Sequence, residues 1–255
     1  MLLAIDVGNT HLVCGLWNGD RWVSLWRKAT RPEDTEDELA VWLKSMFELS
    51  GHPWRISEAI CASVVPSLDA ALEQMCLRWL GVGLWFLRTG IQVGLQVDYN
   101  PPTAVGADRL ANAIGALALY APPIIVVDFG TATTFDTIDK FGRYVGGAIL
   151  PGVQISSQAL FIKAAKLPSV EYKAPVTALG KDTAHSLQSG IMFGYADAID
   201  GLAKRISAEL EGDAIVIATG GLGGLFTGLC DRIVSYEPTL TLDGLRRAYK
   251  STVSL

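Results

Sequence analysis

Cysteine and charged residues are scarce in this 255-residue sequence, and basic residues nowhere form a run. No two of the four cysteines have the spacing of a zinc or iron–sulfur site. Three of the four lie in apolar stretches, which indicates buried free thiols in a reducing compartment; the four are Cys14, Cys61, Cys76 and Cys230. The net charge of −5 and the lack of a basic cluster argue against a nucleic-acid-binding protein.

Long hydrophobic runs are also missing. The most apolar internal run, residues 113–127, is short for a membrane span and contains Pro122-Pro123. Near the N-terminus, Asp6 interrupts the first apolar stretch and no basic residue precedes it, which argues against a signal peptide. We therefore expect a soluble, cytoplasmic protein without a membrane anchor.

Several catalytic motifs are absent as well. Lys181 follows a glycine, but no Walker phosphate-loop pattern surrounds it, and there is no His-Glu-x-x-His motif or nucleophile elbow. What the chain has in excess is apolar residues. Hydrophobic residues make up 50% of the chain and charged residues 18%, against roughly 25% charged residues in ordinary soluble domains. This surplus predicts a large core together with a buried subunit interface.

Two stretches share a plan in which an apolar strand ends at an aspartate, a tight glycine-bearing turn follows, and a second strand leaves the turn. They are residues 4–17, with Asp6 and Gly8-Asn9-Thr10, and residues 125–136, with Asp128 and Gly130. Glycine permits the close backbone approach that a phosphate-binding turn requires. An ordinary hairpin explains the first stretch alone equally well. Its repetition favours a duplicated domain that holds a phosphate, and a third turn, residues 219–221, follows a strand expected at 214–218.

The segment 95–109 predicts two charged residues at the start of a helix. A strand ends in a proline-stiffened loop, and Gly106 leads into a helix whose apolar residues share one face. Asp108 and Arg109 come at the beginning of this helix. A carboxylate held there can act as a base, and a guanidinium can bind the oxygens of a transferring phosphate. The alternative is that Asp108 is a simple N-cap.

The remaining pattern predicts alternating strands and helices. Thr35 and Glu38 form a capping box that begins a helix ended by Gly51. Strands are expected at 21–29, 59–65 and 84–87, and a helix at 68–79 that ends at Gly81. Gly146-Gly147 is expected to turn the chain beside an apolar strand. A long helical pattern over 187–206 carries small residues at positions 190, 194 and 201, for which dimer packing and internal core packing are both open explanations.

Taken together, these motifs resemble those of the type III pantothenate kinases, which belong with acetate and sugar kinases, heat-shock chaperones and actin. The resemblance covers nearly the whole chain and rests on segments 6–10, 106–109, 128–134, 146–152, 181–183, 188–190, 219–221 and 238–245, in the family's order. It implies an α/β fold of two duplicated actin/ribonuclease-H-like halves, each a mixed β-sheet flanked by helices, with an interdomain ATP cleft. The halves would be residues 1–117 and 118–255.

The resemblance also implies an activity and the residues that carry it. The activity is ATP-dependent phosphorylation of pantothenate to 4'-phosphopantothenate, the first step of coenzyme A biosynthesis, by direct in-line transfer. Asp108 is the implied general base, with Arg109 beside it. The implied ATP-binding residues are Asp6, Val7, Gly8, Asn9, Thr10, His11, Leu12, Val13 and Thr131, and those for pantothenate are Tyr99, Gly106, Ala107, Asp108, Arg109 and Thr183.

Cofactors and partners follow from the same resemblance. Asp6 would help to place Mg²⁺, and Asp128 would ligate a monovalent cation, K⁺ or ammonium. The family forms homodimers, with part of the pantothenate pocket contributed by the second subunit. Two alternatives remain open: a different small-molecule kinase or phosphohydrolase on the same scaffold, and a non-catalytic regulator that uses the scaffold as a nucleotide switch. An acceptor panel separates the kinases, and nucleotide binding without phosphorylation would favour the regulator.

Overall fold

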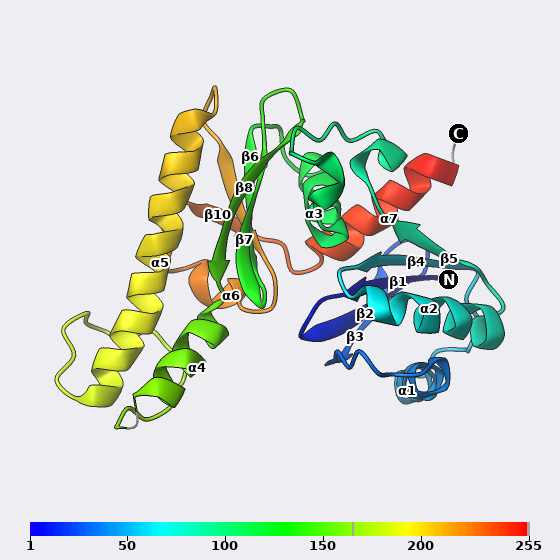
Figure 1. Cartoon of the computed structure of the whole chain (residues 1–255), viewed down its shortest axis with the longest axis horizontal. Helices are drawn as coiled ribbons and strands as arrows, with labels where there is room; N and C mark the ends of the chain where they lie inside the picture. The colour runs from blue at the N-terminus through cyan, green and yellow to red at the C-terminus, as the bar shows by residue number, and fades with distance from the viewer. Residues whose placement is uncertain (165, 254–255) are drawn as a thin grey trace. The chain divides into compact units, whose positions relative to one another are not determined.

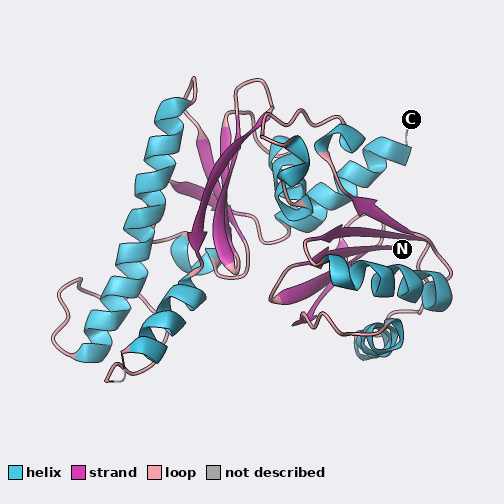
Figure 2. Cartoon of the chain, in the orientation of Figure 1, coloured by secondary structure: helices cyan, strands magenta, loops and turns pink. Residues whose placement is uncertain are grey.

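The computed structural model describes residues 1–164 and 166–253, which form two compact units (Figures 1 and 2). Unit 1 contains residues 1–95, 100–115 and 241–253. Unit 2 contains residues 96–99 and 116–240, apart from residue 165. Each unit holds one five-stranded sheet. Within the described ranges, no helix is long and apolar enough to cross a membrane.

The sheet of unit 1 has the strand order β3-β2-β1-β4-β5. Its strands are β1 (Leu2–Val7), β2 (His11–Trp17), β3 (Trp22–Ala29), β4 (Glu58–Ser63) and β5 (Leu84–Leu87). Strands β1, β2 and β3 pair antiparallel, whereas β4 joins the other edge of β1 in parallel and β5 continues beyond it. Strand β1 is therefore central, and its almost unbroken apolar sequence is typical of a strand buried on both faces.

Helices cover both faces of this sheet (Figure 1). Helices α1 (Glu36–Leu49) and α2 (Pro66–Met75) bury the face that carries Leu3, Ile5 and Val7. The opposite face receives α3 (Ala107–Leu117) and α7 (Leu240–Val253), with Leu242 placed over Gly15. Helices α3 and α7 cross very closely: a methyl group added at Gly244 would lie 1.8 Å from the carbonyl oxygen of Ala111. Only glycine at position 244 allows this approach.

The sheet of unit 2 has the order β10-β9-β6-β7-β8, the same arrangement as in unit 1. Its strands are β6 (Ile124–Phe129), β7 (Ala132–Ile138), β8 (Tyr144–Pro151), β9 (Ile215–Thr219) and β10 (Ile233–Tyr236). Again the first three pair antiparallel, and the last two join in parallel on the other side of the first. Helices α4 (Val153–Lys163), α5 (Thr183–Glu209) and α6 (Gly223–Phe226) pack with the face that carries Ile125 and Val127.

The predicted fold class is confirmed, because each half is a mixed sheet flanked by helices and both halves have the same strand order. The division at residue 117 differs from the two compact units in three stretches: residues 96–99 and 116–117 belong to unit 2, and residues 241–253 to unit 1. Residues 241–253 pack with unit 1, because α7 lies on α3 through Gly244. Residues 96–99 pack with unit 2, because their backbone pairs with that of Tyr144.

Several local predictions can be compared directly with the structure. The Thr35–Glu38 capping box is present, and Gly51 and Gly81 follow their helices in the left-handed conformation. Helix α2 runs into a π-helical turn, Cys76–Leu80, before Gly81. The prediction that Gly146-Gly147 turns the chain was wrong: both residues lie inside β8, with φ values of 119° and 158°. Their backbone conformations suit glycine in a distorted strand, where β7 and β8 shift register.

Candidate active site

The hairpin turn of unit 1 is fixed by backbone hydrogen bonds. The Gly8 amide donates to the His11 carbonyl over 3.0 Å. Thr30, just after β3, donates its hydroxyl to the Gly8 carbonyl over 2.6 Å and its amide to the Thr10 carbonyl over 2.9 Å. Asn9, Thr10 and His11 remain exposed. The turn is thus rigid on its inner side and offers polar groups to solvent on its outer side.

The side chain of His11 lies at the edge of this turn. Desolvation lowers the pKa of His11 below its ordinary value, and the positive charge of Arg27 lowers it further. Both effects favour the neutral imidazole, which can donate one hydrogen bond and accept another at the edge of the turn.

The start of helix α3 lies at the same end of the unit 1 sheet as this turn. Asp6 is paired with Ala62 of β4, and Val64, just beyond β4, donates its amide to the Val7 carbonyl over 3.0 Å. A methyl group at Gly106 would lie 3.4 Å from the side chain of Val64. The structure therefore brings Asp6, the Gly8 turn and the 106–109 segment to the carboxyl ends of the parallel strands β1 and β4. In open α/β sheets this is the edge where ligands bind.

Asp108 lies in the first turn of α3 rather than at its N-cap. The carbonyl of Gly106 accepts the first helical hydrogen bond, from the Leu110 amide, so Gly106 precedes the helix and Asp108 lies within it. The Asp108 carboxylate accepts the Arg109 amide over 2.8 Å and folds back over Gly106, where an added methyl group would lie 2.5 Å from its oxygen. The N-cap alternative is thus wrong, and a side chain at position 106 would have to displace the Asp108 carboxylate.

Burial also changes the acidity of Asp108. Desolvation raises the pKa of this carboxyl above its ordinary value, and the hydrogen bond and positive charge of Arg109 oppose the rise only in part. A carboxylate with a raised pKa is a stronger base than an ordinary aspartate. It has the chemistry needed to accept a proton from a hydroxyl group.

The corresponding hairpin of unit 2 carries Asp128 and Thr131. Gly130 donates its amide to the Ala132 carbonyl over 3.1 Å, and Gly152 donates to the Thr131 carbonyl over 3.1 Å. A methyl group at Gly152 would lie 2.3 Å from the Thr131 carbonyl oxygen. The start of α4 therefore packs directly against the turn, while Thr131 itself is exposed. The sequence did not reveal this contact, because residues 131 and 152 are brought together by the β7–β8 hairpin.

The third glycine turn also packs on Asp128. Gly220, with φ of 84°, lies so near that a methyl group there would be 2.4 Å from an Asp128 carboxylate oxygen and 2.7 Å from the Phe129 amide nitrogen. Tyr236 donates its hydroxyl to the Gly220 carbonyl over 3.0 Å and lies against Gly223. Tyr236 was missed by sequence reasoning, because a lone tyrosine ending an apolar strand carries no signal of this contact.

Two predicted substrate residues lie in unit 2. The ring of Tyr99 is 37% exposed and lies against Gly146. Thr183 is exposed at the first position of α5, whereas Tyr195, three turns along that helix, hydrogen-bonds with Thr133 of β7 over 2.7 Å. Twelve residues of helix span roughly 18 Å. Within unit 2 the structure therefore does not bring Thr183 to the Asp128 hairpin.

The carboxylates with proposed metal roles are distributed between the units, with Asp6 in unit 1 and Asp128 in unit 2. In the part of the chain that the structure describes, no three His, Cys, Asp or Glu side chains gather as they do in an all-side-chain metal site. Any cation at Asp6 or Asp128 would thus need further oxygen ligands from backbone carbonyls, water or phosphate. Oxygen ligands of this kind suit hard cations.

Comparison of the sequence with known proteins identifies the family of this chain. The sequence profile of the type III pantothenate kinase family matches residues 2–205. The chain is 47% identical over 248 residues to a type III pantothenate kinase of Desulfatibacillum aliphaticivorans, covering 96% of each chain. It is 43% identical over 254 residues to one of Halalkalibacterium halodurans, covering 99% of this chain and all of that relative.

Solved structures with little sequence similarity share the fold. Component A of the (R)-2-hydroxyglutaryl-CoA dehydratase of Acidaminococcus fermentans is 16% identical with a TM-score of 0.57, covering 99% of this chain and 98% of its own. The ROK hexokinase of Thermus thermophilus is 13% identical with a TM-score of 0.50, covering 100% and 99%. These likenesses concern the fold alone. The profile match and the full-length relatives show that the chain belongs to the type III pantothenate kinase family.

Proposed function

We propose that this chain transfers the γ-phosphoryl group of ATP directly to the primary hydroxyl of pantothenate, with Asp108 as the general base. The observation that carries the mechanism is the desolvated Asp108 carboxylate, held at the start of α3 with a raised pKa. It accepts the hydroxyl proton as the hydroxyl oxygen attacks the γ-phosphorus and ADP leaves. Arg109, next in the same helical turn, balances charge on the transferring group.

The proposed ATP ligands are residues 6–13 of the first hairpin and Thr131 of the second. The exposed Asn9, Thr10 and His11, on a turn braced by Thr30, support this role because rigid turns present backbone amides to phosphate oxygens. Residues Gly106 to Arg109, Tyr99 and Thr183 are the proposed pantothenate contacts.

Two cations fit the donor chemistry of the chain. Asp6 is the proposed carboxylate for Mg²⁺, and Asp128, beside the carbonyl-rich turns at 130–131 and 220, is the proposed ligand for K⁺ or ammonium. When bound, such cations neutralise negative charge on the phosphates. The chain's own contribution is to hold each carboxylate in place, which Gly220 does for Asp128 by close packing.

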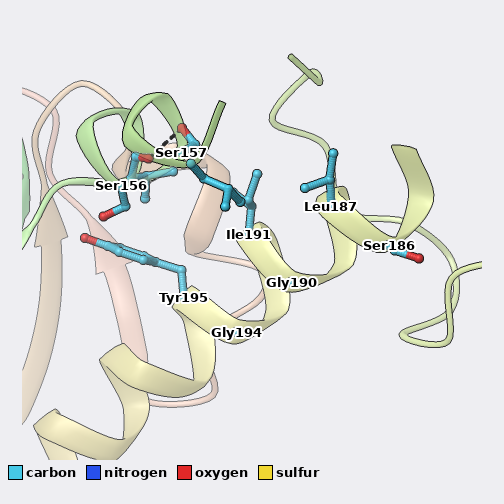
Figure 3. A pocket seen from close by; sticks show the side chains of 10 residues that line it. Ser156, Ser157, Ser186, Leu187, Gly190, Ile191, Gly194 and Tyr195 are labelled. Carbon is cyan, nitrogen blue, oxygen red and sulfur yellow. Dashed lines mark hydrogen bonds between the residues drawn. The ribbon is translucent and has the colours of Figure 1, made fainter. Parts of the chain in front are cut away.

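A homodimer is the proposed assembly, with the surface along α4 and α5 as its interface (Figure 3). A groove of about 550 Å³ runs between these helices, and Figure 3 shows the Tyr195 hydroxyl directed toward the Ser156 end of α4. The groove is lined by Val153, Ser156, Ser157, Leu160, Ser186, Leu187, Gly190, Ile191, Gly194 and Tyr195. Methyl groups at Gly190 and Gly194 would meet nothing within 4 Å, so this face of α5 has room for another helix.

The position of Thr183 supports the same assembly. Because it lies roughly 18 Å along α5 from Tyr195, Thr183 is proposed to serve the pantothenate site of the partner subunit. The cytoplasm is the proposed location, in keeping with four buried free thiols whose pKa values burial raises above the ordinary range.

The direct test is ADP release by the purified protein with a panel of acceptors, run with and without K⁺. Stimulation by pantothenate alone, dependent on K⁺ or ammonium, is the expected result. Stimulation by a sugar or by acetate would indicate another kinase. Nucleotide binding without any phosphorylation would indicate a regulator.

The dimer is tested by complementation between two inactive variants, Asp108→Asn and Thr183→Val. If Thr183 serves the partner's site, each mixed dimer carries one intact site, made from the wild-type Asp108 of one subunit and the wild-type Thr183 of the other. Mixing equal amounts should restore about a quarter of wild-type activity, because half of the dimers are mixed and half of their sites are intact. If no activity returns although subunit exchange is verified, Thr183 does not act across an interface.

A further inference from the structure

The segment that carries Tyr99 is joined to the edge of the unit 2 sheet by an isolated β-bridge. Val97 forms a parallel bridge with Tyr144, the first residue of β8. The Tyr144 amide donates to the Gln96 carbonyl over 2.9 Å, and the Asp98 amide donates to the Tyr144 carbonyl over 2.8 Å. Both backbone groups of this single residue therefore hold the segment immediately before Tyr99.

The side chain of Tyr144 is fixed at its far end as well. It is fully buried, and its hydroxyl donates to a carboxylate oxygen of Asp136 over 3.0 Å. Asp136 is itself fully buried in β7, where a carboxylate needs hydrogen-bond donors to offset the loss of water. A hydrogen bond from a hydroxyl to a carboxylate is among the stronger kinds in proteins. Tyr144 is thus held by its backbone on one side and by Asp136 on the other.

The ring of Tyr99 rests on this fixed residue. The Tyr99 and Tyr144 rings meet edge to face, with centroids 6.4 Å apart and planes at 69°. The Tyr99 ring also lies over Gly146, where an added methyl group would be 3.7 Å from a ring carbon. Gly146 has φ of 119°, a conformation that glycine adopts without strain and alanine does not.

We infer that Tyr144 and Gly146 are positioning residues for pantothenate, which set the place of Tyr99 without contacting the substrate. This inference rests on the proposed function, in which Tyr99 contacts pantothenate. A ring anchored on a buried residue and a bare backbone keeps one orientation when the substrate is absent. Less conformational entropy is then lost when pantothenate binds, so the affinity for pantothenate is higher.

The test is Tyr144→Phe, which removes one hydroxyl and keeps the ring. The matched control is Tyr249→Phe, which removes a hydroxyl that donates to the Glu58 carboxylate over 3.3 Å and lies in unit 1, whereas Tyr99 belongs to unit 2. For Tyr144→Phe we expect the KM for pantothenate to rise about tenfold, a loss of binding free energy similar to that of one hydrogen bond. The kcat and the KM for ATP should change less than about twofold. Tyr249→Phe should leave all three unchanged.

A double-mutant cycle with Tyr99→Ala separates positioning from general loss of structure. If Tyr144 acts through Tyr99, then Tyr144→Phe raises the KM for pantothenate no further once Tyr99 is alanine. An equal rise in both backgrounds, or no rise in the wild-type background, would overturn the inference. If wild-type enzyme phosphorylates pantothenate but Tyr99→Ala has a normal KM, this inference fails while the proposed activity stands.

A second pair of variants covers the case in which Tyr144→Phe does not fold. Gly146→Ala and Gly142→Ala introduce similar strain into the β7–β8 hairpin, because both glycines have positive φ, but a methyl group at Gly142 meets Leu117 rather than Tyr99. Only Gly146→Ala should raise the KM for pantothenate, by about threefold, and only when Tyr99 is present. Equal effects of the two variants would contradict the inference.

Discussion

Gly220→Ala is expected to damage the Asp128 site through a defined collision. A methyl group at this position would lie 2.4 Å from an Asp128 carboxylate oxygen, 2.7 Å from the Phe129 nitrogen and 2.8 Å from the Phe129 carbonyl carbon. Two of these three atoms belong to the backbone of β6, so a side-chain rotation cannot relieve the contact. Either the 219–221 turn or the end of β6 must shift.

The expected loss of stability has two parts. Placing alanine at φ of 84° costs about 1 kcal/mol. Forcing an extra methyl group into a filled site adds about 1–3 kcal/mol. The matched control is Gly212→Ala, at φ of 111°, where the methyl group would make only ordinary contact, 3.6 Å from Pro123. The control should lose about 1 kcal/mol, and Gly220→Ala about 2–4 kcal/mol.

Thermal unfolding and urea titration of both variants measure this difference, which corresponds to roughly 2–4 °C in Tm per kcal/mol. The same preparations test the proposed activation by K⁺. Because the collision displaces Asp128, Gly220→Ala should need a higher K⁺ concentration for half-maximal activity, whereas Gly212→Ala should respond as wild type. Equal losses of stability with equal responses to K⁺ would refute the packing argument.

Three further predictions concern unit 1. Asp108→Asn should lower kcat by about 10²–10⁴-fold, as expected for a missing base. The Tm of this variant should also rise. Burial raises the folded-state pKa of Asp108, so the carboxyl group stabilises the fold at low pH, and this stabilisation is lost as the pH rises through the folded-state pKa. For the same reason, the acid limb of the wild-type kcat/KM profile should lie above the pKa of an ordinary aspartate. Thr30→Val removes the 2.6 Å hydrogen bond to the Gly8 carbonyl, and should cost about 1 kcal/mol in urea unfolding and raise the KM for ATP. Gly244→Ala places a methyl group 1.8 Å from the Ala111 carbonyl oxygen, and should destabilise unit 1 by about 3 kcal/mol or abolish its folding, as circular dichroism would show.

Much of the fold follows from short-range pattern. The two hairpins were predictable because apolar strands, aspartate and glycine turns act within a dozen residues. The start of α1 was predictable because a capping box is local, and Gly51 and Gly81 mark helix ends for the same reason. The π-helical turn at 76–80 was missed because an extra residue in one turn leaves the apolar stripe nearly unchanged.

The contacts that could not be predicted join residues distant in the chain. The close crossing of Gly244 and Ala111 depends on two helices more than a hundred residues apart, and glycine alone does not indicate its neighbour. The same holds at the candidate site. Asp128 could be proposed from its own hairpin, but the packing of Gly220 upon it, and the hydrogen bond from Tyr236, exist only once β6, β9 and β10 have paired. Sequence pattern located the chemical groups, and tertiary structure supplied the parts that hold them.

The membership of α7 in unit 1 has a consequence for biosynthesis. A ribosome delivers residues 1–115 first, yet the helix that fills the face over Gly15 is delivered only after the whole of unit 2. The five strands of the N-terminal sheet are complete at Leu87, but one of its apolar faces stays uncovered by α7 until the last strand of the second sheet has been made. A nonsense mutation near codon 240 removes α7, and it should therefore destabilise unit 1, most of which is translated first.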